Sequence, residues 1–187
     1  MKKVFYVPIF GGLGNQMFQA AHAIEFGKKY KAKIVFIDFT NEFTRIKRGW
    51  QLNCFNIRPT KISIIKKLII LFRIKFSSYL IKINKKFHLD VLHESKSKFK
   101  KYKSSEQNKK IIYGYWQSEK YFINSKDKVK ECFSFPSIGE EIINSENNVV
   151  AIHVRLGDYL NDKISNKFHY VCDQLWYFNA IKTMRDL

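Results

Sequence analysis

Three side chains that could bind an anion lie close together in the sequence, at the end of a short apolar run. The run covers residues 149–154, with His153 as its one polar member, and Arg155 and Asp158 follow. Such a run is typical of a strand buried in a parallel sheet, and open α/β sheets bind ligands just beyond the carboxyl ends of their strands. A guanidinium keeps its charge and offers a planar fork of donors, which suits a phosphate or pyrophosphate. We therefore predict an anion site around Arg155; a surface turn with an ion pair is the alternative.

A second candidate for ligand binding is the glycine-rich segment GGLGNQ at residues 11–16. A glycine-rich loop that leads into a helix presents free backbone N–H groups and the positive end of the helix dipole to an anion. The segment is not a dinucleotide fingerprint, because Met17 stands where the third glycine would be, and it lacks the GK[ST] of a Walker loop. Asn15 and Gln16 add neutral donors and acceptors that suit sugar hydroxyls or a nucleotide edge. The alternative is a helix-capping turn with Asn15 near the N-cap.

The elements around this loop form a predicted βαβ unit. Residues 3–10 and residues 33–38 are apolar runs typical of strands. Between them, from Asn15 to about Tyr30, apolar residues recur at helical spacing and lysines collect toward the end, as the helix dipole favours. Parallel strands joined by a helix have a right-handed crossover, so the sequence predicts a parallel α/β domain.

Later segments continue this pattern. Residues 111–116 predict another strand, and Ser118 is placed to cap a helix that follows it. A short helix is expected around residues 138–144, ahead of the apolar run at 149–154, and a final helix begins at about Asp173.

The composition indicates a folded protein. Hydrophobic residues make up 45% of the 187 residues and aromatic residues 16%, which excludes a disordered chain. The net charge of +18 would suit a nucleic acid, but lysine is over-used together with Ile, Asn, Phe and Tyr, which all have AT-rich codons, so we expect no such partner. Three distant cysteines, Cys54, Cys132 and Cys172, argue for a reducing compartment and against a zinc site. The N-terminal apolar run leads directly into the glycine segment and is interpreted as a strand, not a signal peptide.

Residues 61–92 combine Ile, Leu and Phe with many lysines. The longest unbroken apolar run, residues 68–72, is too short to span a bilayer. Because the cations are spread around the helical wheel, we expect ordinary helices with buried and solvated faces; docking on a membrane surface is the alternative. Residues 95–110 are expected to be a solvated connector, and His88 and His93 lack partners at metal-ligand spacing.

Three segments occur in a distinctive order: GGLGNQMFQ at residues 11–19, GYWQSEKYF at 114–122 and HVRLGDY at 153–159. Together they resemble the α-1,2-fucosyltransferases of glycosyltransferase family 11, and the resemblance extends over essentially the whole chain. It implies an enzyme of lipopolysaccharide O-antigen or capsule synthesis that moves L-fucose from GDP-fucose to the 2-hydroxyl of a terminal galactose. It also implies a GT-B architecture of two Rossmann-like domains, inversion at the fucose carbon, and no metal or other cofactor. In agreement, no two aspartates are spaced as DxD, the usual metal signature of other transferases.

By this resemblance, Arg155 is the catalytic residue and matches the first Arg of the family's HxRRGD motif. It would hold the β-phosphate of GDP and stabilise the negative charge that grows on the departing diphosphate. His153 and Asp158 match the same motif and are expected to shape the donor pocket. The loop that faces the donor from the other domain is matched by Gly12, Gly14, Asn15 and Gln16. The base that deprotonates the acceptor hydroxyl is not identified.

Two departures from the family pattern affect the predicted organisation. Leu156 stands where many members have a second Arg, and the later SDD and STFSWWGA-like segments are missing. The resemblance therefore assigns residues 1–147 to the N-terminal, acceptor-side Rossmann-like domain and residues 148–187 to the beginning of a truncated GDP-fucose-binding domain. We expect a cytoplasmic protein, with the inner face of the bacterial membrane as its peripheral contact. The alternative to a transferase is an inactive remnant that binds a glycan, a membrane surface or a nucleic acid through its basic surface.

Overall fold

The computed structural model describes residues 3–43, 47–83, 90–94, 99–101, 108–134, 152–154, 156 and 171–185. The chain divides into two compact units, Met1–Ile138 and Gly139–Leu187. The division of function between an acceptor-side and a donor-side domain, with its boundary after residue 147, stays a prediction.

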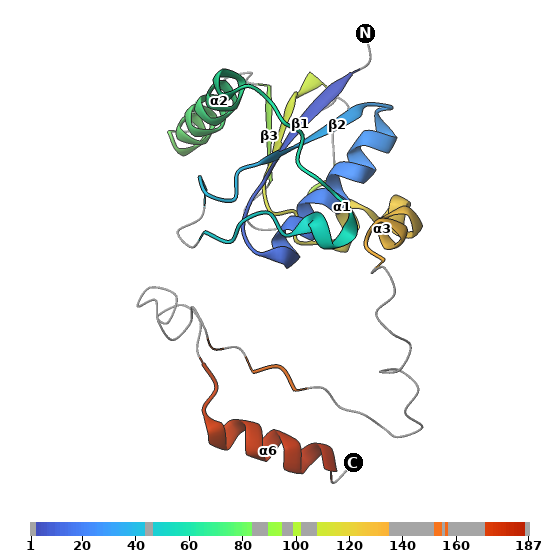
Figure 1. Cartoon of the computed structure of the whole chain (residues 1–187), viewed down its shortest axis with the longest axis vertical. Helices are drawn as coiled ribbons and strands as arrows, with labels where there is room; N and C mark the ends of the chain where they lie inside the picture. The colour runs from blue at the N-terminus through green and yellow to red at the C-terminus, as the bar shows by residue number, and fades with distance from the viewer. Residues whose placement is uncertain are drawn as a thin grey trace. The chain divides into compact units, whose positions relative to one another are not determined.

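The first unit is built on a four-stranded sheet in the order β2-β1-β4-β3 (Figure 1). All strand pairs are parallel, and β1 pairs with β2 along its whole length but meets β4 only where Tyr6 lies opposite Ile111. The strands are β1 (Val4–Ile9), β2 (Lys33–Asp38), β3 (Val91–His93) and β4 (Ile111–Tyr113). The predicted βαβ unit and the Rossmann-like parallel α/β class are confirmed, whereas the GT-B pairing of two such domains stays a prediction.

Helix α1 (Leu13–Lys29) covers one face of the sheet and begins two residues before its predicted start. Side chains alternate along β1, so Phe5, Val7 and Ile9 point to the same side and join a buried core with residues of α1. His22 of this helix is fully buried and its ring stacks on Trp116, with ring centroids 4.0 Å apart. Burial disfavours the charged imidazolium and lowers the pKa of His22 to about 3.

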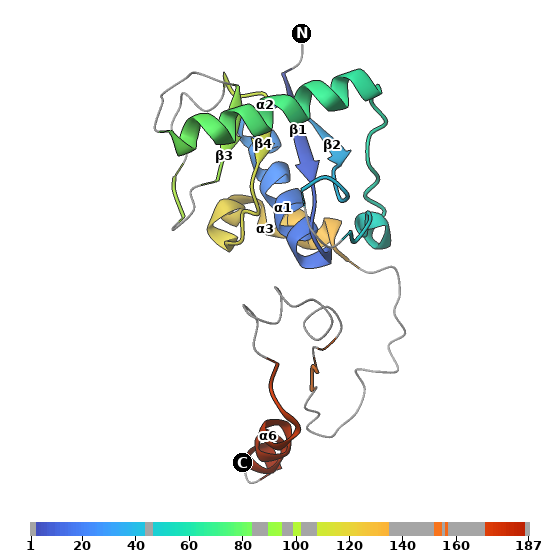
Figure 2. The ribbon, with the colours of Figure 1, turned by 90° about the vertical axis from the view of Figure 1, so that its left-hand side faces the viewer.

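Helix α2 (Ile64–Lys82) lies on the opposite face of the sheet (Figures 1 and 2). Its N-terminus is capped by Ser63, whose hydroxyl accepts a hydrogen bond from the backbone N–H of Lys66 at 3.3 Å. The side against the sheet buries Ile70, Ile74, Ser77 and Leu80. The expected helix with one buried and one solvated face is confirmed, but the exposed side carries large apolar residues as well as cations. Among the described residues, no helix is both long and apolar enough to cross a membrane.

The chain leaves β4 through Trp116, a buried residue with a left-handed backbone at φ +59°. The Ser118 hydroxyl then accepts a hydrogen bond from the backbone N–H of Lys120 at 3.4 Å, as predicted for a cap. The helix expected here is a series of shorter elements: the 3-10 turns η3 (Glu119–Tyr121) and η4 (Ile123–Ser125), followed by α3 (Lys126–Cys132). A further 3-10 turn, η1 (Leu52–Phe55), packs beside α1.

The second unit contains helix α6 (Gln174–Arg185), which confirms the predicted final helix. None of the described residues of α6 is buried. The expected buried strand at residues 149–154 is wrong for its described part, because residues 152–154 form no strand and Ile152 and Val154 are each 52% exposed. A strand needs a neighbour for its backbone hydrogen bonds, and the described residues of this unit contain none. The helix expected around residues 138–144 and most of the connector at 95–110 lie outside the described residues.

Candidate functional site

A cavity of about 840 Å³ lies at the carboxyl edge of the parallel sheet. The segments that leave β1, β3 and β4 all contribute to its wall, together with the last two turns of α2. This is where parallel α/β sheets bind their ligands. The lining residues are Phe10, Phe43, Ser78, Ile81, Lys82, His93, Glu94, Tyr113, Gly114, Tyr115 and Gln117.

The glycine segment forms the turn between β1 and α1. Gly11 has a φ of +82°, and a side chain there would approach the Asn15 amide nitrogen to 2.9 Å, so only glycine fits without strain. Gly12 is the N-cap of α1 and, as a glycine, has no side chain that could cap the helix. Gly14 is exposed, with no other atom within 4 Å of the place where its Cβ would lie. The backbone at Gly14 is thus open to a ligand, whereas the Arg48 side chain would lie 3.6 Å from a Cβ at Gly12.

Two buried glutamines of α1 hold this turn in shape. The Gln16 side-chain amide donates to the carbonyl oxygens of Gly11 at 2.8 Å and Gly49 at 2.9 Å, and its Oε1 accepts from the backbone N–H of Gln51 at 2.9 Å. Gln19 exchanges two hydrogen bonds with the backbone of Phe10, at 3.0 and 2.9 Å. The sequence predicted that Gln16 and the glycine loop together contact a ligand. In the structure the Gln16 side chain instead holds the loop in shape and is not presented to solvent.

Asn15 connects the first two of the three sequence segments. It lies in the first turn of α1, three residues after the N-cap Gly12, so the segment is also the helix-capping turn that the sequence offered as an alternative. Its Oδ1 accepts a hydrogen bond of 2.6 Å from Nε2 of Gln117, a residue 102 positions away. Because Gln117 also lines the cavity, the GGLGNQ and GYWQSEKYF segments lie side by side at its rim.

Four aromatic side chains form one wall of the cavity; we call Phe10, Phe43, Tyr113 and Tyr115 the aromatic cluster. The Phe10 ring contacts the other three with centroid distances of 5.0 to 5.3 Å. Burial raises the pKa values of both Tyr113 and Tyr115, so both hydroxyls remain protonated at neutral pH. An aromatic wall with two hydroxyls suits a ligand that has both apolar ring faces and polar groups.

His93 is the last residue of β3 and Glu94 follows it, and both line the cavity. Nε2 of His93 lies 2.8 Å from Oγ of Ser77 on α2, and burial, together with nearby Lys109, lowers the pKa of His93 to about 4. The ring is therefore neutral at pH 7. Oε2 of Glu94 accepts a hydrogen bond of 2.7 Å from the backbone N–H of Tyr115, which holds the carboxylate at the rim.

The sequence did not single out these cavity residues as a site. The one feature of the sequence that could have indicated the site is the position of four residues at or just after the ends of strands: His93, Glu94, Tyr113 and Tyr115. This feature was missed because β3 is only three residues long and was not predicted. Of the HVRLGDY segment, Arg155 and Asp158 lie outside the described residues, and His153 is exposed. The described residues contain no cluster of three or more His, Cys, Asp or Glu side chains that could hold a metal ion.

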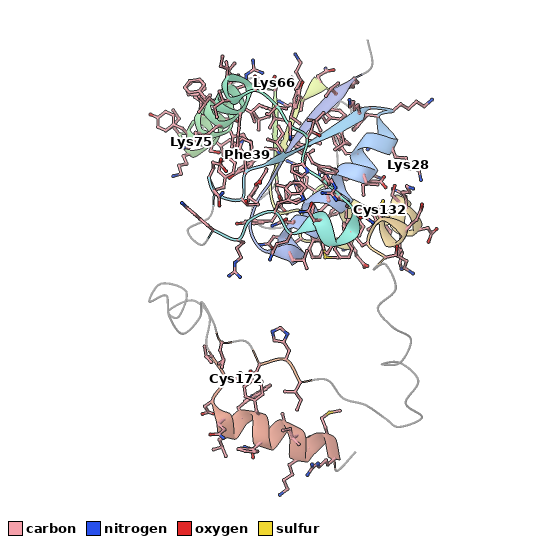
Figure 3. All side chains as sticks on the ribbon, in the orientation of Figure 1. Lys28, Phe39, Lys66, Lys75, Cys132 and Cys172 are labelled. Atoms are coloured by element: carbon pink, nitrogen blue, oxygen red, sulfur yellow. The ribbon has the colours of Figure 1, made fainter. Side chains whose placement is uncertain are left out.

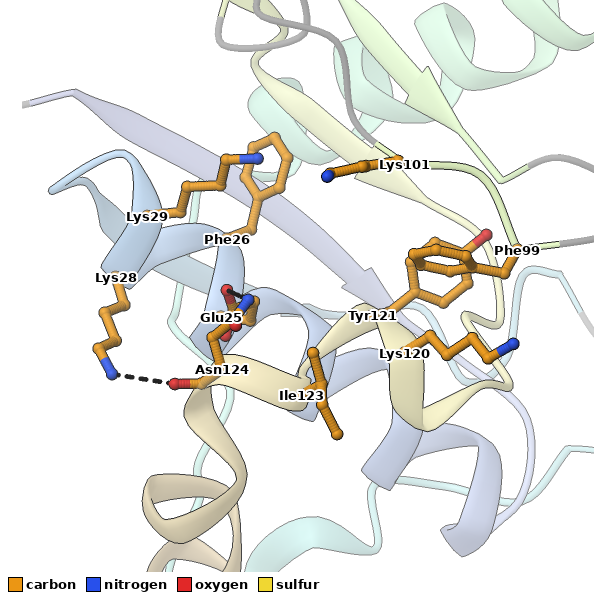
Figure 4. Close-up of a pocket in the computed structure, with 10 residues that line it drawn as sticks. All are labelled: Glu25, Phe26, Lys28, Lys29, Phe99, Lys101, Lys120, Tyr121, Ile123 and Asn124. Atoms are coloured by element: carbon orange, nitrogen blue, oxygen red, sulfur yellow. Dashed lines mark hydrogen bonds between the residues drawn. The ribbon is translucent and has the colours of Figure 1, made fainter.

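A second cavity, of about 730 Å³, lies near the C-terminal end of α1 (Figure 4). Lysines surround it, and the carboxylate of Glu25 lies inside, where its Oε1 accepts a hydrogen bond of 3.3 Å from Nδ2 of Asn124. Nζ of Lys28 donates to the Asn124 carbonyl oxygen at 3.2 Å. This cavity contains none of the residues that the sequence predicted for the site.

Together, the parallel sheet, the glycine turn at the start of α1 and the cavity at the carboxyl edge define a Rossmann-like α/β protein with a candidate ligand site at that edge. The particular family follows from comparison with known proteins. The chain belongs to glycosyl transferase family 11, whose sequence profile matches residues 1–186.

Two curated relatives from Escherichia coli are similar to this chain. Alpha-1,2-colitosyltransferase is 29% identical over 188 residues, which cover 94% of this chain and 62% of the relative. The O-antigen biosynthesis glycosyltransferase WbnK is 28% identical over 219 residues, which cover 97% of this chain and 68% of the relative. The chain thus spans about two thirds of the length of these relatives. No solved structure matches it.

Proposed function

We propose that this protein is a galactoside α-1,2-fucosyltransferase of O-antigen synthesis, which uses GDP-fucose as donor and needs no metal ion. The observation that carries the proposal is the family match over residues 1–186, which includes all three motif segments. The names of the relatives support an α-1,2 linkage and an O-antigen product. The free cysteines Cys54, Cys132 and Cys172 agree with action in the cytoplasm.

In the proposed reaction, the 2-hydroxyl oxygen of a terminal galactose attacks the anomeric carbon of fucose from the face opposite the diphosphate. The bond from that carbon to the diphosphate oxygen breaks, its electron pair leaves with GDP, and the acceptor proton passes to a base. Arg155 would stabilise the charge on the diphosphate, with His153 and Asp158 shaping the donor pocket. The glycine turn at Gly12 and Gly14 would face the donor with its backbone N–H groups.

The cavity at the carboxyl edge is proposed as the acceptor site, and Glu94 as the base. His93 is the weaker candidate, because burial opposes its protonation. Glu94 is held at the rim by the backbone of Tyr115, and its carboxylate lines the cavity. Glu94→Gln preserves the shape and removes the base, so we expect kcat to fall by about 100-fold or more while GDP binding is unchanged. An equal kcat in this variant would contradict the assignment.

Colitose transfer is a second candidate, because one relative is named a colitosyltransferase. A thermal-shift titration with GDP, GDP-fucose and GDP-colitose tests both candidates against an inactive remnant. At saturation a ligand present at about 100 times its Kd raises Tm by about 5 to 10 °C for a chain of this size. Arg155→Ala should abolish the rise, and transfer to lactose, followed by mass spectrometry, identifies the sugar. A folded protein that none of the three nucleotides stabilises would contradict the proposal and favour the remnant.

A further inference from the structure

Helix α2 presents a continuous apolar surface on the side turned away from the sheet. We call this surface the outer face of α2. Its members are 41% to 68% exposed and recur at helical spacing: Ile65, Leu68, Ile69, Phe72, Phe76 and Tyr79. Phe72 and Phe76 stack with parallel rings at 5.7 Å, so the middle of the outer face is a flat aromatic patch. Contiguous exposed apolar patches on folded proteins mark interaction sites.

Cations lie on both borders of the outer face. At 100° per residue, Lys75 and Lys82 fall on one border and Lys66 and Arg73 on the other. Arg73 forms an ion pair with Asp90 at 2.7 Å, and Nζ of Lys66 lies 4.5 Å from the centroid of the Tyr6 ring, so the charge offered to a partner surface comes mainly from Lys75 and Lys82. Figure 3 shows Lys66 and Lys75 on this helix. Helix α2 contains five cationic residues and no acidic one. The sequence interpretation considered only the spread of the cations and therefore overlooked the apolar stripe between them.

We propose that the outer face of α2 docks on an anionic membrane surface. An apolar stripe bordered by lysines is the pattern of helices that lie in the membrane interface, with the apolar side chains in the acyl boundary and the ammonium groups among the lipid phosphates. The charge pattern opposes a second copy of the chain, because two α2 helices in contact would bring together cations with no acidic partner on either helix. A nucleic acid would leave the apolar centre uncovered.

Helix α2 also contributes to the wall of the candidate site. Ser78, Ile81 and Lys82, from the last two turns of α2, line the 840 Å³ cavity, and Ile81 is still 53% exposed. Helix α2 thus has the outer face on one side and, near its C-terminal end, part of the cavity wall on another. This proposal stands apart from the transfer reaction, because vesicle binding is measured without a nucleotide sugar.

The test is co-sedimentation of the whole chain with phosphatidylcholine vesicles that contain or lack phosphatidylglycerol. We expect binding only to the anionic vesicles, with partitioning about tenfold lower for Phe72→Ser. Lys75→Gln should lower it by about fivefold, because one lysine near an anionic surface is lost. Phe72 is 66% exposed, so the fold should persist, which circular dichroism verifies.

Two matched controls change exposed apolar residues that lie outside α2. Ile123 is 52% exposed on η4, which packs on α1 at the other face of the sheet, and Phe178 is 58% exposed on α6. Serine at either position should leave vesicle binding unchanged. Equal loss in Ile123→Ser, or loss in Phe178→Ser alone, would overturn the assignment to α2. The proposal also fails if wild type does not sediment with anionic vesicles, or if Phe72→Ser only converts a dimer into a monomer.

Discussion

The hydrogen bonds of Gln16 make a sharp test of how the glycine turn is held. Gln16→Leu keeps the approximate volume of the side chain but removes all three bonds, to Gly11, Gly49 and Gln51. A net hydrogen bond contributes about 1 kcal/mol, and an unsatisfied buried partner costs about 1–3 kcal/mol more. The Gly11 bond is buried, whereas water can replace the other two in part. We therefore expect the free energy of unfolding to fall by about 3 kcal/mol.

Urea unfolding followed by circular dichroism measures this loss. With an m-value of about 2 kcal/mol/M, the midpoint should fall by about 1.5 M while the slope stays the same. Gln117→Leu is the control, because this exposed glutamine also forms a hydrogen bond near the turn, but its loss leaves no buried polar group without a partner. The midpoint of this variant should move by no more than about 0.3 M. If both variants unfold at the wild-type midpoint, the three bonds do not hold the turn.

Three further outcomes follow from the structure. The pKa of His22 is lowered from 6.5 to about 3, so its contribution to stability is present above pH 6.5 and is lost as the pH falls, because the unfolded state binds a proton that the folded state does not; between pH 7 and pH 5 wild type should lose about 2 kcal/mol more than His22→Phe in urea titrations, and equal losses in the two proteins would contradict this. Gly114→Ala would place Cβ 2.4 Å from Cβ of Glu94, so Tm should fall by at least about 5 °C in calorimetry, and an unchanged Tm would show that the two segments can separate freely. Gln117→Ala removes the 2.6 Å bond to Asn15 and should weaken GDP-fucose binding by several-fold in calorimetric titration without changing Tm; unchanged affinity would separate this contact from the donor site.

The elements with a clear period were predictable from the sequence. β1, α1 and β2 follow one another within residues 4–38, and their apolar spacing specifies both the elements and the right-handed crossover. β3 was not predicted because Val91–His93 is too short to show alternation. The apolar run at 149–154 looks like a buried strand, but its partner strands are not present among the described residues of the second unit.

Which residues form the site depends on contacts that sequence spacing does not contain. Asn15 and Gln16 were predicted as polar groups for a ligand, and the sequence provided no sign that Gln16 would be buried. Its burial depends on the backbone at Gly49 and Gln51, more than 30 residues away, which approaches the turn only in the folded chain. The contact of Asn15 with Gln117 likewise spans 102 positions.

The strand order also determines when this domain can fold during synthesis. β1 pairs with β2 almost at once, but its other edge waits for β4, which follows about 100 residues later. Until residue 113 has left the ribosome, a nascent chain therefore exposes one edge of an apolar strand, while α2 emerges without a completed sheet to cover its inner side. Aggregation of newly made protein should accordingly be sensitive to the speed of translation between residues 38 and 111, and a slow stretch of codons there would prolong the exposure of that edge.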